Sequence, residues 1–202
     1  MVSAINNYAI LDVIQPPEEI RKGVIVLPGI VNVTPRWAKV VSVGDGIIDG
    51  HGTARKPDVD IGQTVYVTAH GQYGIHKNAS MEIDNIAAAS ILDILAILED
   101  LETMKIQPLG SYVEIEKIEI DEKSEHGIEL PDSRKTPTNL GIVKTVGIGW
   151  TGPYGTPIPM QVNVGDKVVY NPLRTMIVDF SSIGKDEKKY LIQHGDILGV
   201  VK

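Results

Sequence analysis

Short apolar or alternating runs recur along the whole chain, separated by glycine, proline and aspartate. Clear examples lie at 38–43, 64–68, 112–118, 141–146 and 167–170. Strands with one buried face show this alternation, and glycine, proline and aspartate favour the turns between them. The core residues are mainly Val, Ile and Leu, which suit the pleated surface of a sheet. The pattern predicts an all-β protein made of small barrels or sandwiches.

The pattern occurs twice. Gly-Val-Ile-Val-Leu-Pro at 23–28 is matched by His-Gly-Ile-Glu-Leu-Pro at 126–131, an offset of 103 residues (126 − 23). The same offset relates three glycines and one tripeptide of each half: Gly44 and Gly147, Gly46 and Gly149, Gly62 and Gly165, 93–95 and 196–198. So long a repeat predicts two globular domains, 1–100 and 104–202, rather than a solenoid. The short joint without Pro, Gly or Ser predicts domains held side by side.

Residues 85–99 are the one ambiguous segment. Three alanines followed by isoleucine, leucine and aspartate favour an amphipathic helix on propensity alone. The matching segment, 189–201, has two strand-like runs around His194 and Gly195 instead. Because equivalent parts of a duplication share a fold, we expect strands in both halves.

Composition excludes several classes of partner. The net charge of −7 with 43% hydrophobic residues indicates a globular protein and argues against nucleic acid as a ligand. The longest apolar stretch, 86–98, is too short and too polar to span a bilayer. The first residues lack a targeting pattern, so we expect a cytoplasmic protein, with an organelle stroma or matrix as the alternative if a targeting segment has been removed.

No motif predicts catalysis. Cysteine is absent, which excludes thiolate chemistry and cysteine-ligated metal. The five histidines lack the spacing of a metal motif, and Asp186–Lys189 is interpreted as a turn between strands. Gly-Asp-Gly at 44–46 is not followed by the Lys-Ser/Thr of a phosphate loop. We therefore expect a protein that is not an enzyme and has no catalytic residues, metal or cofactor.

In order and spacing, the motifs resemble two fused copies of the chaperonin-10 family, the GroES-type co-chaperonins. The resemblance runs nearly end to end and rests on five kinds of motif: Lys-Ile-Gln-Pro-Leu at 105–109, Gly-Ile-Glu-Leu-Pro at 127–131, Val-Gly-x-Gly at 43–46 and 146–149, Val-x-x-Gly-Asp-Lys-Val at 162–168 with its counterpart at 59–65, and Asp-Ile-Leu near each end. It implies two tandem GroES-like small β-barrels, each with a long mobile loop and a roof hairpin.

The resemblance implies that the mobile loops are 18–37 and 120–140. In the family, an apolar triplet in this loop contacts the chaperonin, and the matching residues are Ile25, Val26 and Leu27 in the first half and Ile128, Glu129 and Leu130 in the second. Alternate side chains of an extended segment share a face, so Glu129 need not be buried. Two buried aliphatic side chains contribute only about 3–6 kcal/mol gross, so useful affinity requires several loops on one ring. A core strand would not tolerate the change from Val26 to Glu129.

The resemblance also implies that the roof of the dome is formed by hairpins at 46–56 and 149–159. Their candidate residues differ between the halves, so the two roofs present different surfaces: Gly46, Ile47 and His51 against Gly149, Trp150 and Tyr154. The halves also differ at their start, where Asn6-Asn7-Tyr8 stands against Gln107-Pro108-Leu109. This difference predicts a first strand that starts or pairs differently.

The sequence thus predicts a co-chaperonin: a homo-oligomeric ring that binds the apical domains of a GroEL-type chaperonin ring carrying ATP or ADP and encloses an unfolded substrate protein. In the family, rings of seven copies face seven chaperonin sites, whereas a ring of whole tandem chains has an even number of domains. The sequence leaves the number of chains per ring open. A competing hypothesis is a structural β-barrel protein of a virion or surface assembly that keeps the fold without chaperonin binding. A dehydrogenase is excluded, because no nucleotide-binding half and no zinc ligands follow.

Overall fold

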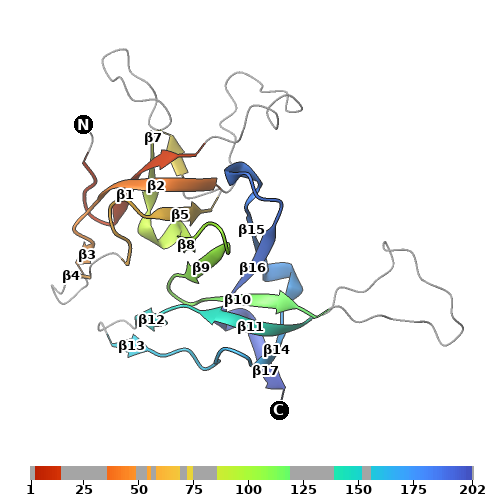
Figure 1. Ribbon diagram of the computed structural model, residues 1–202. Helices are drawn as coiled ribbons and strands as arrows, with labels where there is room; N and C mark the ends of the chain where they lie inside the picture. The colour runs from red at the N-terminus through yellow and green to blue at the C-terminus, as the bar shows by residue number, and fades with distance from the viewer. Residues whose placement is uncertain are drawn as a thin grey trace, which may run out of the picture.

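Two large β-sheets with corresponding strand orders and two small hairpins make up the described part of the protein (Figure 1). The structure is a computed structural model that describes residues 3–14, 36–48, 54–55, 58–68, 72–74, 86–118, 139–151 and 156–201. Within these ranges the chain forms strands and short 3₁₀ helices, and none of the described residues is α-helical. The predicted all-β fold with two small barrels is confirmed.

The first sheet has seven strands in the order β6-β7-β1-β2-β5-β8-β9, and every neighbouring pair is antiparallel. Its strands are β1 (Tyr8–Val13), β2 (Arg36–Val43), β5 (Thr64–Val67), β6 (Gln72–Gly74), β7 (Ile86–Ser90), β8 (Ile94–Asp100) and β9 (Lys105–Pro108). Six of them come from the first half of the chain. The seventh, β9, comes from the second half.

The second sheet repeats the order as β15-β16-β10-β11-β14-β17. Its strands are β10 (Tyr112–Lys117), β11 (Leu140–Val146), β14 (Lys167–Tyr170), β15 (Met176–Asp179), β16 (Lys188–Gln193) and β17 (Ile197–Val201). Each half adds one small hairpin, made by β3 (Ile47–Ile48) with β4 (Ala54–Arg55) and by β12 (Trp150–Thr151) with β13 (Pro157–Ile158). The C-terminal strand β17 ends its sheet, because β14 is its one neighbour in the described ladders.

The first strands of the two halves correspond in detail. Tyr8 begins β1 as Tyr112 begins β10, an offset of 104 residues (112 − 8), and both strands carry a bulge two residues later. Asn6 and Gly110 precede them with φ of 53° and 54°, a left-handed conformation that glycine and asparagine tolerate best. The match of Asn6-Asn7-Tyr8 with Gln107-Pro108-Leu109 is therefore wrong, because Asn6 corresponds to Gly110. The prediction that the two halves start differently holds, since the second half opens with β9, which pairs with β8, and the described residues 3–7 form no strand. One extra residue between β1 and β2 changes the offset from 104 to 103 residues.

The ambiguous segment 85–99 forms strands, as the duplication predicts. Strand β7 is followed by a 3₁₀ turn at Ile91–Asp93 and then by β8. The second half has the same sequence of elements, with a 3₁₀ turn at His194–Asp196 between β16 and β17. The side chains of Ala87 and Ala89 are buried against the first core, where β7 is paired on both sides. Pairing and burial thus override the helix propensity of alanine.

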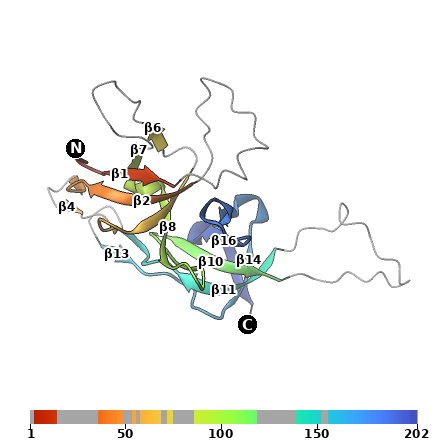
Figure 2. The ribbon, with the colours of Figure 1, turned by 45° about the horizontal axis from the view of Figure 1, so that its top comes forward.

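Three apolar clusters hold the protein together. One fills the first barrel and includes Leu11, Val40 and Val65, and a second fills the other barrel around Val113 and Tyr170. The third contains residues of both halves: Trp37, Tyr66, Leu95 and Ala96 with Ile106, Val178, Phe180 and Leu191. The two barrels are therefore packed side by side, as Figure 2 shows.

Candidate functional site

The six predicted contact residues, Ile25, Val26, Leu27, Ile128, Glu129 and Leu130, lie outside the described residues. The structure does define where their loops begin and end. In the first barrel the loop connects β1 to β2, and the Ile14 amide donates to the Trp37 carbonyl over 3.0 Å. In the second, the loop connects β10 to β11, and the Ile118 amide donates to the Leu140 carbonyl over 3.0 Å. Both loops therefore start and end on adjacent antiparallel strands with the same hydrogen bond at the base.

The two small hairpins begin in the same way. The Gly46 amide donates to the Asn6 carbonyl over 2.9 Å, and the Gly149 amide donates to the Gly110 carbonyl over 3.1 Å. Both glycines have positive φ, 96° and 97°, and a Cβ on Gly149 would lie 2.5 Å from the Ile158 carbonyl oxygen. Only glycine fits such a position.

Of the other roof residues, Ile47 pairs with Arg55 and Trp150 pairs with Ile158. His51 and Tyr154 lie outside the described residues. The hairpins are thus built alike in both halves. Their role as a roof stays a prediction.

The structure also shows how the two side-by-side barrels join, at a seam whose residues the sequence did not indicate. Strand β9 of the second half pairs with β8 of the first, with Ala96 opposite Pro108 and Leu98 opposite Ile106. The next residue, Leu109, donates its amide to the Leu95 carbonyl over 2.9 Å and is buried in the core of the first barrel. The second half thereby completes the sheet and the core of the first.

Aromatic side chains form the other part of the seam. The Trp37 ring lies 5.0 Å from the ring of Tyr66 and 5.0 Å from that of Phe180, between centroids. The Trp37 indole donates to the Asp179 carbonyl over 2.9 Å, and the Tyr66 hydroxyl donates to the Ile177 carbonyl over 3.1 Å. Such tilted and edge-to-face pairs stabilise beyond their buried area. Trp37 and Tyr66 of the first half thus each donate a hydrogen bond to the backbone of β15 in the second half.

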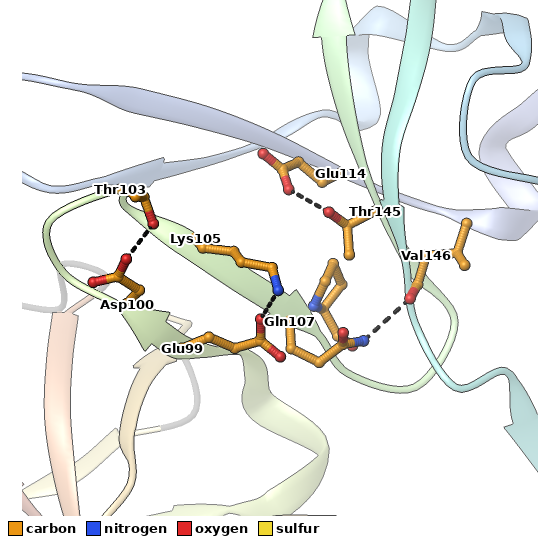
Figure 3. Close-up of polar contacts among 9 residues, drawn as sticks. Glu99, Asp100, Thr103, Lys105, Gln107, Glu114, Thr145 and Val146 are labelled. Atoms are coloured by element: carbon orange, nitrogen blue, oxygen red, sulfur yellow. Dashed lines mark hydrogen bonds and ion pairs between the residues drawn. The ribbon is translucent and has the colours of Figure 1, made fainter.

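Polar contacts order the turn between β8 and β9 (Figure 3). Thr103 Oγ1 donates to Asp100 Oδ2 over 2.6 Å, and this hydrogen bond holds the pKa of Asp100 below its usual value. Lys105 Nζ lies 2.7 Å from Glu99 Oε2, and the carboxylate raises the pKa of Lys105. The Gln107 amide donates to the carbonyls of Pro108 and Val146. The ion pair is exposed and contributes little stability, but the set fixes the turn geometry.

Alkaline pH should weaken the seam through Tyr66. Burial raises the pKa of Tyr66 above its usual value of 10.0, and a hydrogen bond from the Asp179 amide works in the opposite direction. The unfolded chain therefore loses this proton first, so the stabilisation is fully present below the unfolded pKa and is lost as pH rises through the higher folded pKa. Denaturant unfolding measures the free energy of unfolding at about pH 8 and above pH 10. The decrease between the two pH values should be smaller for Tyr66→Phe than for the unchanged protein. Equal losses would contradict this role.

A buried ion pair distinguishes the second barrel from the first. Glu114 is 6% exposed, lies 2.8 Å from Lys189 through Oε1, and accepts a 2.9 Å hydrogen bond from Thr145 through Oε2. The counterparts of Glu114 and Lys189 in the first half are Ile10 (114 − 104) and Ile86 (189 − 103).

The prediction of a turn at 186–189 is wrong at its end, because β16 begins at Lys188.

Other kinds of site find no support in the described part of the chain. No cluster of three or more histidine, aspartate or glutamate side chains there is arranged to hold a metal ion. Among the same residues, no helix has the length and hydrophobicity needed to cross a membrane.

Comparison with known proteins finds two matches in tandem along the chain. The family model described as "Chaperonin 10 Kd subunit", Cpn10, matches twice, over residues 1–98 and 105–201. A relative from Arabidopsis thaliana, "20 kDa chaperonin, chloroplastic", is 29% identical over 191 residues, which cover 93% of this chain and 71% of the relative.

Shorter relatives match half of the chain. "Co-chaperonin GroES" of Coprothermobacter proteolyticus is 38% identical over 99 residues, 48% of this chain and 96% of the relative. The protein of the same name from Natranaerobius thermophilus is 37% identical over 100 residues, 49% of this chain and 100% of the relative. With two family matches in tandem and two barrels of the same strand order, the resemblance is confirmed, and the chain belongs to the chaperonin 10 family.

Proposed function

We propose that this protein is a co-chaperonin whose two domains, 1–100 and 104–202, each serve as one unit of an oligomeric lid on a chaperonin ring. The observation that carries the proposal is the double family match, one for each barrel, together with relatives named as co-chaperonins. The seam supports the oligomeric part, because it shows that two such barrels join through their sheet edges. The lid is not an enzyme and holds no cofactor or metal.

The loop triplets are the proposed contact with the apical domains of the chaperonin. Each loop begins and ends on a pair of adjacent strands, so the two ends of each loop are fixed close together. Two aliphatic side chains per loop give weak binding, and attachment of many loops to one rigid ring multiplies the effective concentration. If the chaperonin loses its contacts with several loops at the same time, the whole lid is released.

Nucleotide control belongs to the partner in this proposal. A GroEL-type ring binds and hydrolyses ATP, and the lid responds only if its affinity differs between two states of the apical domains. An unfolded substrate protein is enclosed rather than bound, which fits the net charge of −7 on the lid. The cytoplasmic location stays a prediction, and the chloroplastic relative supports the alternative of an organelle stroma.

The test is co-sedimentation with a purified bacterial chaperonin in ATP, in ADP and without nucleotide. The unchanged protein should bind in a nucleotide-dependent way, and Leu27→Asp and Leu130→Asp should each reduce binding at least about tenfold, because a buried carboxylate is unfavourable in an apolar groove. If one variant binds normally, the loop of that half takes no part.

Val26→Glu is the matched control. It places a negative charge at the residue next to Leu27 and copies Glu129 of the second half. It should bind like the unchanged protein, because the middle side chain of the triplet points away from the contact. Absence of binding in every nucleotide condition would overturn the proposal and leave a structural β-barrel protein. Equal loss with Val26→Glu would show that the triplet does not bind through one face.

A further inference from the structure

The first loop, which connects β1 to β2, is closed at its base by two residues that pack on the seam. The Ile14 amide donates to the Trp37 carbonyl over 3.0 Å. Trp37 is fully buried and belongs to the apolar cluster that both barrels share. Ile14 is partly buried and packs against the same cluster. Both sides of the base of the first loop therefore rest on a cluster to which the second barrel contributes.

The second barrel contacts the Trp37 side chain directly. The Phe180 ring lies 5.0 Å from the Trp37 ring, between centroids, and the Asp179 carbonyl accepts the indole hydrogen bond at 2.9 Å. The 3₁₀ turn Ser181–Ile183 contacts β2, and Figures 1 and 2 show this turn beside the start of that strand. These contacts restrict the Trp37 side chain to one arrangement, and the backbone at the end of the loop is restricted with it.

The base of the second loop, between β10 and β11, is built from the same backbone hydrogen bond but with other side chains. The Ile118 amide donates to the Leu140 carbonyl over 3.0 Å. Leu140 is only partly buried, and neither residue belongs to the three apolar clusters of the described residues. Beside this base, Lys117 Nζ lies 3.8 Å from the centroid of the Tyr190 ring. Both partners of that contact belong to the second barrel, so it does not cross the seam.

The sequence explains why the two bases differ. The counterparts of Trp37 and Tyr66 are Leu140 and Val169 (37 + 103 and 66 + 103). Tyr66 lies with its ring 5.0 Å from that of Trp37 and donates its hydroxyl to the Ile177 carbonyl of the second barrel. Leucine and valine have neither a ring nor a hydrogen-bond donor in the side chain. The base of the second loop is therefore not held by an aromatic cluster of this kind.

We propose that Phe180 of the second barrel is a positioning residue for the first loop: it holds Trp37 and so fixes the end of the loop at β2. A segment whose ends are fixed loses less conformational entropy when it binds, so the two loops differ in affinity for a partner. The difference in affinity rests on the chaperonin contact proposed above. The fixing of the loop base is a property of the free protein and does not depend on that contact.

Hydrogen exchange of two backbone amides in the full-length, free protein tests the fixing of the base. The amides of Ile14 and Ile118 are bonded across the two bases, so each exchanges when its own base opens. Phe180→Leu keeps an apolar side chain and removes the ring. It should speed exchange at Ile14 at least about fivefold, the freedom of about one backbone residue, and leave Ile118 unchanged. Unchanged exchange at Ile14, or equal acceleration at both amides, would overturn the proposal.

Ile192→Ala is the matched control. Ile192 is fully buried in the core of the second barrel and is not part of the shared cluster. Its truncation destabilises the same barrel as Phe180→Leu through lost buried volume. Exchange at Ile14 should stay unchanged in this control. Equal acceleration would show that the loop base responds to the stability of the second barrel and not to Phe180.

Trp37→Phe is a second test with a smaller change in packing. It keeps an aromatic ring beside Phe180 and removes the hydrogen bond to the Asp179 carbonyl. Exchange at Ile14 should again be faster than in the unchanged protein, with Ile118 unaffected. An unchanged rate at Ile14 would contradict the role of the second barrel at this base. Circular dichroism of both variants should match that of the unchanged protein, which shows that faster exchange is not loss of fold.

Chaperonin binding through one loop at a time tests the consequence. With Leu130→Asp, which leaves the first loop as the proposed contact, the further change Phe180→Leu should weaken binding at least about fivefold. With Leu27→Asp, which leaves the second loop, Phe180→Leu should have no effect. Equal weakening in both would overturn the positioning role. If neither protein binds a chaperonin, the proposed function fails, whereas exchange at Ile14 still decides whether the second barrel fixes the loop base.

Discussion

Replacing Trp37 with alanine should lower the free energy of unfolding by about 3–5 kcal/mol, the usual range for a fully buried tryptophan. The side chain is 0% exposed and packs on Tyr66 and Phe180 from the two barrels. Truncation opens a cavity between the barrels and leaves the Asp179 carbonyl without its indole donor. The loss should therefore couple the two domains, so that the second barrel also becomes easier to unfold.

Urea unfolding followed by circular dichroism measures this effect. Trp37→Phe keeps an aromatic ring and removes the donor, so it should cost about 1–3 kcal/mol, the range for an orphaned buried acceptor. Leu140→Ala, at the counterpart position, should cost less than Trp37→Ala, because Leu140 is only partly buried. A Trp37→Ala protein as stable as the unchanged one would show that the aromatic cluster does not hold the barrels together.

Glu114→Ala should destabilise the second barrel by about 3–5 kcal/mol, since it leaves the partner of a buried ion pair without its counter-charge. Lys189 is 18% exposed through its side chain and lies 2.8 Å from the carboxylate that the substitution removes. Thr145 loses its acceptor at the same time. Most of the lost stability comes from the Lys189 ammonium group, which stays buried without a counter-charge, and not from the net strength of the ion pair.

The first barrel supplies the control for this prediction. Glu114→Ile with Lys189→Ile copies Ile10 and Ile86, which occupy the counterpart positions in the same fold. The double variant should be about as stable as the unchanged protein or more stable by about 1–4 kcal/mol, as found when apolar residues replace buried ion pairs. Denaturant unfolding of the unchanged protein, of Glu114→Ala and of the double variant measures these differences in the free energy of unfolding. A double variant as unstable as Glu114→Ala would mean that the site cannot accept the packing of the first barrel.

The duplication determined how much of the fold was predictable from sequence. Residues 85–99 have the propensity of a helix, and only the strand-like partner segment indicated β7 and β8 correctly. The same comparison failed near the start, where it matched Asn6-Asn7-Tyr8 to residues 107–109. That match has an offset of 101 residues (107 − 6), whereas the structure gives 104 (110 − 6). The equivalence of Asn6 with Gly110 becomes visible through their shared positive φ and through the hydrogen bonds that both carbonyls accept from the hairpin glycines.

The seam was not predictable because a strand does not encode its partner. Residues 105–108 were interpreted as the opening of the second half, whereas β9 completes the sheet of the first. Lys189 was assigned to a turn because a charged run looks solvated, and its burial depends on Glu114 from another strand. The loop triplets, which lie outside the described residues, rest on the family resemblance and on the alternation of side chains alone.

The antiparallel pairing of β8 and β9 also explains how a tandem chain of this kind arises. The end of one barrel and the start of the next run side by side in opposite directions, so the turn of residues 101–104 is enough to join them. Gene fusion at this point needs no long linker and no rearrangement of either fold.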